Sequence, residues 1–264
     1  MNRTPTAATA FTVVLMSVVL AALLTAIVGL SLDPDTGRKF LIYLSIFIGQ
    51  GFMAVPLILY LLNRRVSLVK YLRLNPVESK DILATVLIAV GAVFISEELD
   101  HLMKFILADP QMIENIGEYL LVDSFGSGLI LFIGVGIFAP IGEELLFRGY
   151  LQQFLEKHWQ DVTRAVLVTA LTFAIIHLNP YWVIQAYLMG VVLGYLAWRT
   201  NSVLPAIICH GVYNSLALLI SNLFPTKTAF YYWGSHVSPL WLLLAAGITA
   251  AGFYLLHNRV KVTT

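Results

Sequence analysis

The sequence predicts an all-α membrane protein, a polytopic helix bundle of about eight transmembrane helices with a cytoplasmic N-terminus and C-terminus. Of its 264 residues, 59% are hydrophobic and 12% are charged, whereas soluble domains carry about 25% charged residues. Long apolar segments recur along the chain, and most have the roughly 20 residues that a bilayer core of about 30 Å requires. The short connections leave no room for a separate domain, so we expect a single transmembrane domain over residues 1–264.

The apolar segments divide the chain into its predicted elements. The first is about 23 residues long, which exceeds the 7–15 apolar residues of a signal peptide, so we expect a retained helix. The fifth and sixth are short and meet at Asn179–Pro180. They could form two spans or one re-entrant hairpin, and the charge distribution favours two spans. The eight segments are 10–32, 40–62, 82–106, 127–155, 165–179, 181–198, 203–223 and 238–256.

The positive charges orient this bundle. With a cytoplasmic N-terminus, eleven of the 16 Lys and Arg residues fall on the inner side and four on the outer side, as the positive-inside rule requires. The third segment ends in Glu97, Glu98 and Asp100, which we interpret as an outer helix end entering water. Residues 111–125 have the pattern of an amphipathic surface stretch. Whether residues 97–125 form a lid or an outer loop stays open at this point.

The fourth segment contains charged residues where lipid would surround them. A charged side chain at the centre of a span costs about 2.5–3.5 kcal/mol on insertion scales, so such residues mark functional sites. The segment carries Glu143, Glu144 and Arg148. Four-residue spacing allows Glu144 and Arg148 to pair on one helix face. Glu143 is turned by about 100° from Glu144 and remains available for another task.

Two other segments place polar residues at a similar depth. His177 follows Phe173 by four residues in the fifth segment, and Asn214 follows His210 by four residues in the seventh. At about 1.5 Å per residue, Glu143 and both histidines lie within about two helical turns of one layer. We therefore expect three helices to contribute to one shared site.

This set of side chains suits hydrolysis. A carboxylate and an imidazole can take a proton from water, and a second imidazole with an amide can stabilise an oxyanion. A metal centre is the competing interpretation, because Glu143, His177 and His210 could bind zinc with water as the fourth ligand. The single cysteine, Cys209, is predicted to be a packing residue. No basic stretch interleaved with aromatic residues indicates nucleic-acid binding, and the expected partners are membrane lipid and a peptide or membrane-protein substrate.

The ordered motifs resemble the CPBP family, which contains the type II CaaX prenyl endopeptidases and the bacteriocin-processing and immunity membrane proteins. The family pattern is EExxxR, then FxxxH, then HxxxN or HxxxD, each on its own helix. The chain carries these motifs at residues 143–148, at 173–177 and at 210–214. The resemblance covers about residues 127–220, which we expect to be the catalytic core helices.

The resemblance implies intramembrane endoproteolysis by activated water. In the family pattern, Glu143 and His177 would activate the water, while His210 and Asn214 would stabilise the oxyanion. Glu144 and Arg148 would pair and hold the site, with Phe173 packed against it. The metal dependence of the family is disputed, so a divalent metal such as zinc remains an open alternative to no cofactor.

The same resemblance implies a substrate class and a location. The substrates would be prenylated or membrane-associated peptides, and the short chain is similar to the bacterial branch, which implies the bacterial cytoplasmic (inner) membrane. One alternative is a non-catalytic membrane scaffold or bacteriocin-immunity protein of the same family. Another is a transporter or proton relay, because intramembrane Glu and His also occur in such pathways.

Overall fold

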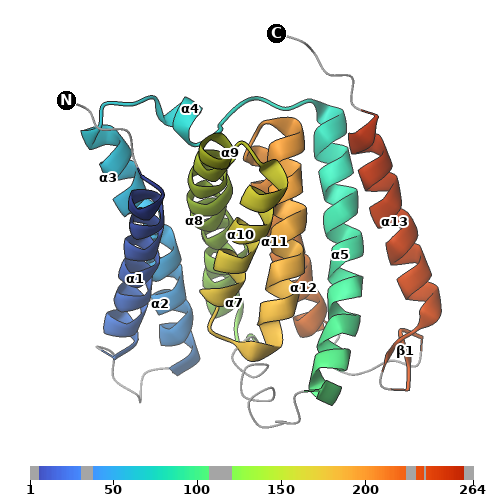
Figure 1. Cartoon of the computed structure of the whole chain (residues 1–264). Helices are drawn as coiled ribbons and strands as arrows, with labels where there is room; N and C mark the ends of the chain where they lie inside the picture. The colour runs from blue at the N-terminus through green and yellow to red at the C-terminus, as the bar shows by residue number, and fades with distance from the viewer. Residues whose placement is uncertain (1–5, 31–37, 107–120, 224–229, 235, 259–264) are drawn as a thin grey trace.

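The computed structural model describes residues 6–30, 38–106, 121–223, 230–234 and 236–258, which form a helical bundle with one short hairpin. Seven helices in this part of the chain are long and apolar enough to cross a membrane. The predicted all-α polytopic fold is therefore confirmed. Helix α1 begins, and helix α13 ends, at the same end of the bundle (Figure 1), as eight crossings require when the shorter apolar helix over Val162–Ile175 is counted with the seven long ones. The cytoplasmic assignment of that end stays a prediction.

The N-terminal helices form a pair with one interruption. Helix α1 (Ala7–Leu30) packs against α2 (Arg38–Phe52), and α3 (Val55–Asn63) continues after a break. The sequence predicts one continuous segment over 40–62. The break lies just before Pro56, in the first turn of α3, because proline has no N–H for the hydrogen bond of a continuous helix. The short helix α4 (Leu68–Tyr71) follows and leads to the long helix α5 (Ser79–Ile106).

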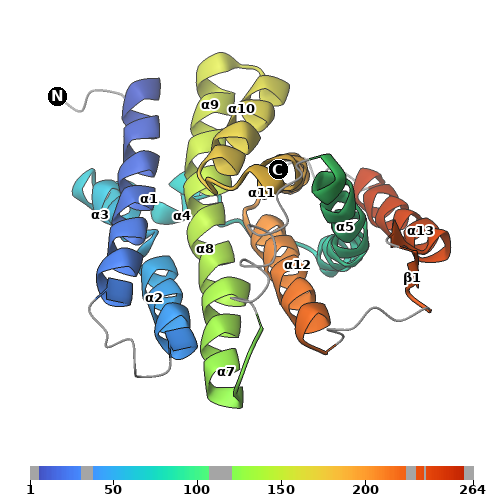
Figure 2. The same ribbon diagram turned by 90° about the horizontal axis from the view of Figure 1, so that it is seen from below.

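The most buried helix is the one predicted to carry the glutamates, residues 125–159, which we call the motif helix. It runs as one rod through the middle of the bundle (Figure 2). Two π-helical stretches interrupt its α-helical geometry. Its consecutive parts are α7 (Phe125–Ile133), η1 (Gly134–Phe138), α8 (Ala139–Glu144), η2 (Leu145–Gln152) and α9 (Gln153–Trp159).

Three further helices complete the central layer, namely α10 (Val162–Ile175), α11 (Pro180–Thr200) and α12 (Leu204–Leu223). Asp161 accepts a hydrogen bond from the backbone N–H of Arg164, and Asn179 accepts one from that of Tyr181, so side chains cap α10 and α11. Helices α10 and α11 pack against each other as two separate helices. With 14 residues, α10 is about 21 Å long and shorter than a bilayer core of about 30 Å.

The far side of the bundle consists of α5 and α13 (Pro239–His257), which pack chiefly on each other. A two-stranded hairpin, β1 (Tyr232–Trp233) and β2 (His236–Val237), precedes α13. The carboxylate of Glu97 accepts hydrogen bonds from the hydroxyls of the hairpin tyrosines, Tyr231 and Tyr232. Glu98 accepts one from the backbone N–H of Val237 at 2.9 Å.

The acidic end of α5, predicted to enter water, thus anchors the hairpin. This contact answers part of the question about residues 97–125. Residues 107–120, which include most of the predicted amphipathic stretch over 111–125, lie outside the described residues.

The apolar core is divided into two clusters, one on each side of the central helices. One cluster joins the motif helix to α1, α3 and α10 and includes Phe147 and Leu151. The other joins α11 and α12 to α5 and α13 and includes Leu193 and Leu196. Between them, polar residues of the motif helix face α11 and α12, which places the polar site at the centre of the bundle.

Candidate active site

The two glutamates lie on the short α-helical part of the motif helix between its two π-helical stretches. All residues from Gly142 to Gln153 are buried. Pro140 stands at the start of α8, where it cannot donate the N–H that a regular α-helix would require, and the wide turns of η1 precede it. Such π-helical turns occur frequently at functional sites. Here they set the direction in which Glu143 and Glu144 leave the helix.

Arg148 is the largest fully buried side chain among the residues that the structure describes. Its Nη1 donates a hydrogen bond to Glu144 Oε1 at 2.8 Å, so the pairing expected from the four-residue spacing is present. Its Nη2 donates to the carbonyl oxygen of Gly190 on α11 at 3.1 Å. The guanidinium carbon also lies 4.3 Å from the centre of the Phe173 ring, an attractive cation–π geometry. These contacts fix Arg148 among the motif helix, α10 and α11.

His210 on α12 completes this buried cluster. Its Nδ1 lies 2.8 Å from Glu144 Oε1. Because an ionised carboxylate can only accept hydrogen bonds, Nδ1 carries the proton. Its Nε2 lies 3.9 Å from Glu143 Oε2, beyond direct hydrogen-bond range. Glu144 therefore binds both Arg148 and His210, and it directs the second ring nitrogen of His210 toward Glu143.

His177 lies just beyond the end of α10 and is half-buried. Its Nδ1 is 2.7 Å from the carbonyl oxygen of Phe173. A carbonyl oxygen only accepts hydrogen bonds, so this nitrogen carries the proton and Nε2 keeps its lone pair. The Phe173 ring lies between the two histidines, with its centre 4.8 Å from that of His177 and 5.9 Å from that of His210.

The predicted site residues therefore converge to different degrees. Glu143, Glu144, Arg148 and His210 form one directly connected cluster. In the described part of the chain, no hydrogen bond or ion pair links His177 to Glu143. Asn214 donates a hydrogen bond from Nδ2 to the carbonyl oxygen of Val135 at 2.9 Å, which leaves its second amide hydrogen free for another acceptor.

The same residues do not gather as metal ligands. Among the residues that the structure describes, no three His, Cys, Asp or Glu side chains lie together in a group that could hold a metal ion. The donor set Glu143, His177 and His210 thus does not fit a preformed zinc centre. Cys209 is fully buried within the apolar cluster of α11 and α12, consistent with a packing role.

Sequence reasoning missed three residues that extend the cluster. Gln152 and Glu156 follow Arg148 at four-residue intervals on the motif helix, and Arg73 pairs with Glu156 from another part of the chain. The continued four-residue spacing of polar residues in an otherwise apolar helix was a signal that could have identified Gln152 and Glu156. The sequence carries no comparable signal for Arg73.

The fold and the cluster define a multi-pass helical membrane protein with a buried glutamate–arginine–histidine site formed by separate helices. Residues 125–216 match the family model of the type II CAAX prenyl endopeptidases, Rce1-like. The match includes all three motifs, which confirms the predicted resemblance to this family.

Two relatives from Lactococcus lactis match the chain over part of its length. UPF0177 protein YbdI of subspecies lactis (strain IL1403) is 33% identical over 118 residues, which are 44% of this chain and 63% of that protein. The UPF0177 protein in the abiGi 5'region of subspecies cremoris is 32% identical over 104 residues, 39% of this chain and 43% of that protein. The matches thus span less than two thirds of either relative. No solved structure matches.

Proposed function

We propose that the protein is an intramembrane endopeptidase that hydrolyses peptide bonds with water activated by Glu143 and His177. One observation carries the proposal. Glu143 is buried, and its Oε2 has no hydrogen-bond partner among the described residues. An ionised carboxylate in such a place is costly unless it is hydrogen-bonded. A water molecule beside Glu143 would satisfy this oxygen and would be the nucleophile.

The neighbouring groups support the subsequent steps. Glu143, assisted by the free Nε2 of His177, accepts a proton from water as the oxygen attacks the peptide carbonyl carbon. With a proton on each ring nitrogen, His210 keeps its Nδ1–H on Glu144, while its Nε2–H and the free amide hydrogen of Asn214 donate hydrogen bonds to the resulting oxyanion. The carboxyl group of Glu143 then passes its proton to the leaving amine, and the C–N bond breaks.

Glu144 and Arg148 act on the orientation of His210. The carboxylate of Glu144 holds the Nδ1 proton, so that Nε2 of His210 faces the reacting atoms, and Arg148 balances the charge of Glu144. The family match supports prenylated or membrane-associated peptides as the proposed substrate class. Residues of this chain supply every step of the proposed mechanism. A divalent metal, if the protein uses one, would need ligands other than a preformed group of three His, Cys, Asp or Glu side chains among the described residues.

Cleavage of a panel of prenylated peptides by the purified protein tests the proposal. Glu143→Gln should lower kcat by about 10²–10⁴-fold, the contribution of a general base, and His177→Ala should lower it as well. Glu78→Gln is the control, because the Glu78 carboxylate pairs with Lys80 at the exposed surface. Parallel reactions with a chelator decide whether a metal takes part.

Two results would contradict the proposal. Cleavage by Glu143→Gln at the wild-type rate would remove Glu143 from the mechanism. A folded wild-type protein that cleaves no member of the panel or of a membrane-protein digest would favour the scaffold or immunity role.

A further inference from the structure

A buried stripe of polar side chains continues from the site along the motif helix. It consists of Glu144, Arg148, Gln152 and Glu156, spaced by four residues, of which the first three are completely buried. Gln152 Nε2 donates to Glu156 Oε1 at 2.8 Å and to the carbonyl oxygen of Gly194 at 2.9 Å. The stripe therefore connects the catalytic layer to the end of the bundle where α4 and α9 lie.

Two glycines of α11 allow this helix to approach the polar stripe closely. Gly190 and Gly194, four residues apart, present their carbonyl oxygens to Arg148 and Gln152. A Cβ at Gly194 would lie 2.8 Å from Gln152 Oε1, so a larger residue would displace the amide. The small-residue pair on α11 thus serves to bind the buried stripe by hydrogen bonds.

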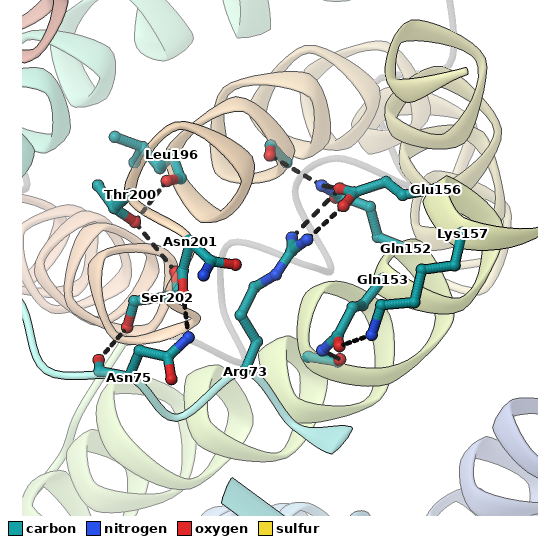
Figure 3. Close-up of polar contacts among 12 residues, drawn as sticks. Arg73, Asn75, Gln152, Gln153, Glu156, Lys157, Leu196, Thr200, Asn201 and Ser202 are labelled. Atoms are coloured by element: carbon teal, nitrogen blue, oxygen red, sulfur yellow. Dashed lines mark hydrogen bonds and ion pairs between the residues drawn. The ribbon is translucent and has the colours of Figure 1, made fainter. Parts of the chain in front are cut away.

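The last residue of the stripe is held by Arg73, which precedes α5. Arg73 is buried, and both of its terminal nitrogens donate to the Glu156 carboxylate, in a bidentate ion pair visible in Figure 3. Its φ of +53° lies in the left-handed region, which is uncommon for a residue other than glycine and persists only where its surroundings enforce it.

The same short segment also binds the connection between α11 and α12. The backbone N–H of Val203 donates to the carbonyl oxygen of Arg73 at 2.8 Å. Asn75 Nδ2 donates to the carbonyl oxygen of Asn201 at 2.6 Å, and Ser202 Oγ donates to that of Asn75 at 2.6 Å. Figure 3 shows Arg73 reaching Glu156 while Asn75 faces the turn that opens α12. We call residues 73–75 the strap.

We propose that the strap is a positioning device that sets the axial register between the motif helix and α12, and thereby the contact between Glu144 and His210. The motif helix carries Glu144, and α12 carries His210. The strap binds the motif helix through Glu156 and the start of α12 through Val203. Arg73 and Asn75 touch neither substrate nor reacting atoms. Their effect on catalysis rests on the proposed function, whereas their effect on the Glu144–His210 hydrogen bond does not.

Magnetic resonance of the histidine side chains tests the register directly. In protein labelled with ¹⁵N-histidine and reconstituted in nanodiscs, the proton that His210 Nδ1 donates to Glu144 should give a downfield signal, assigned with His210→Gln. Arg73→Ala should shift or remove that signal, and Arg73→Lys should preserve it. Glu78→Gln, which breaks an exposed pair in the same connection, should leave the signal in place.

Kinetics provide the second measurement. Arg73→Ala should lower kcat by about 10- to 100-fold with little change in KM, as expected when reacting groups move by about 1 Å, and Arg73→Lys should recover most of the loss. Ser202→Ala is the milder variant if Arg73→Ala does not fold, since it leaves the ion pair intact and removes one hydrogen bond of the strap together with the bond that the Ser202 hydroxyl accepts from the backbone N–H of Leu204.

The outcomes separate the two proposals. An unchanged His210 signal in folded Arg73→Ala or Ser202→Ala protein overturns the strap proposal, whatever the activity. A signal that shifts in Arg73→Ala, together with a wild-type protein that has no peptidase activity, supports the strap and contradicts the proposed function instead. Loss of activity with an unchanged signal would also count against the strap, because the register would then be intact.

Discussion

Substitution of Glu144 by alanine should destabilise the protein strongly, because it leaves a buried guanidinium without its counterion. The side chains of Glu144 and Arg148 are both 0% exposed. Removal of one partner of a buried ion pair costs about 3–5 kcal/mol. At about 2–4 °C per kcal/mol for a domain of this size, Tm should fall by on the order of 10 °C. His210 would lose its acceptor in the same substitution.

The chain supplies its own probe for this measurement. Cys209 is the single cysteine of the sequence and is fully buried, so a fluorogenic maleimide reacts with it only after unfolding. Thermal unfolding followed by this reaction gives Tm in detergent. Glu78→Ala, which removes an exposed partner of Lys80, should change stability by at most about 1 kcal/mol.

A second variant separates loss of charge balance from loss of packing. Glu144→Leu combined with Arg148→Met should recover much of the lost Tm, since replacement of a whole buried ion pair by apolar residues is often neutral or stabilising, while the proposed peptidase activity stays lost. The reasoning is refuted if Glu144→Ala unfolds at the temperature of the wild type and of Glu78→Ala.

Three further predictions concern the surroundings of the site and the hairpin. Phe173→Ala should cost about 3–5 kcal/mol of stability in the maleimide assay, and Phe173→Leu less, since leucine fills most of the volume; equal losses would contradict this volume argument and assign the effect to the aromatic contact with Arg148. Gly190→Ala should cost about 1–3 kcal/mol through overpacking, because its Cβ would lie 3.3 Å from Arg148 Nη2; Gly247→Ala, which meets nothing within 4 Å, should not destabilise. Burial and the Glu97 carboxylate raise the pKa of the hairpin tyrosines above the ordinary value of 10.0. The folded state thus keeps protons that the unfolded state loses, and stability should decline as pH rises above about 10. Absorbance of phenolate, compared with a variant carrying phenylalanine at both positions, checks this, and Glu97→Gln should move the titration to lower pH.

The sequence was informative wherever local spacing determines structure. Apolar segments of bilayer length identified the helices, and four-residue spacing identified the pair of Glu144 and Arg148, because both depend only on neighbours along one helix. The convergence of three helices on one layer was predicted from similar depths. That estimate needed no knowledge of how the helices pack.

The sequence was uninformative where structure depends on distant parts of the chain. Glu144 binds His210 as well as Arg148, and the contact with His210 depends on the rotation of α12 about its axis. The ion pair of Arg73 with Glu156 joins residues 83 positions apart. The π-helical turns around the glutamates also escaped prediction, because the segment that contains them is apolar in either geometry. The hairpin that binds Glu97 and Glu98 depends on contacts across more than 130 positions.

The shortness of α10 has a consequence for the surrounding lipid. This helix exposes Leu171 and Ile175 on the outside of the bundle, yet it falls about 9 Å short of the hydrocarbon thickness. Such hydrophobic mismatch is relieved by local thinning of the bilayer. Headgroups and water should therefore reach deeper beside α10 than beside its neighbours, at the end where His177 lies. A hydrolytic site inside a membrane needs a supply of water, and a helix too short for its bilayer would provide one.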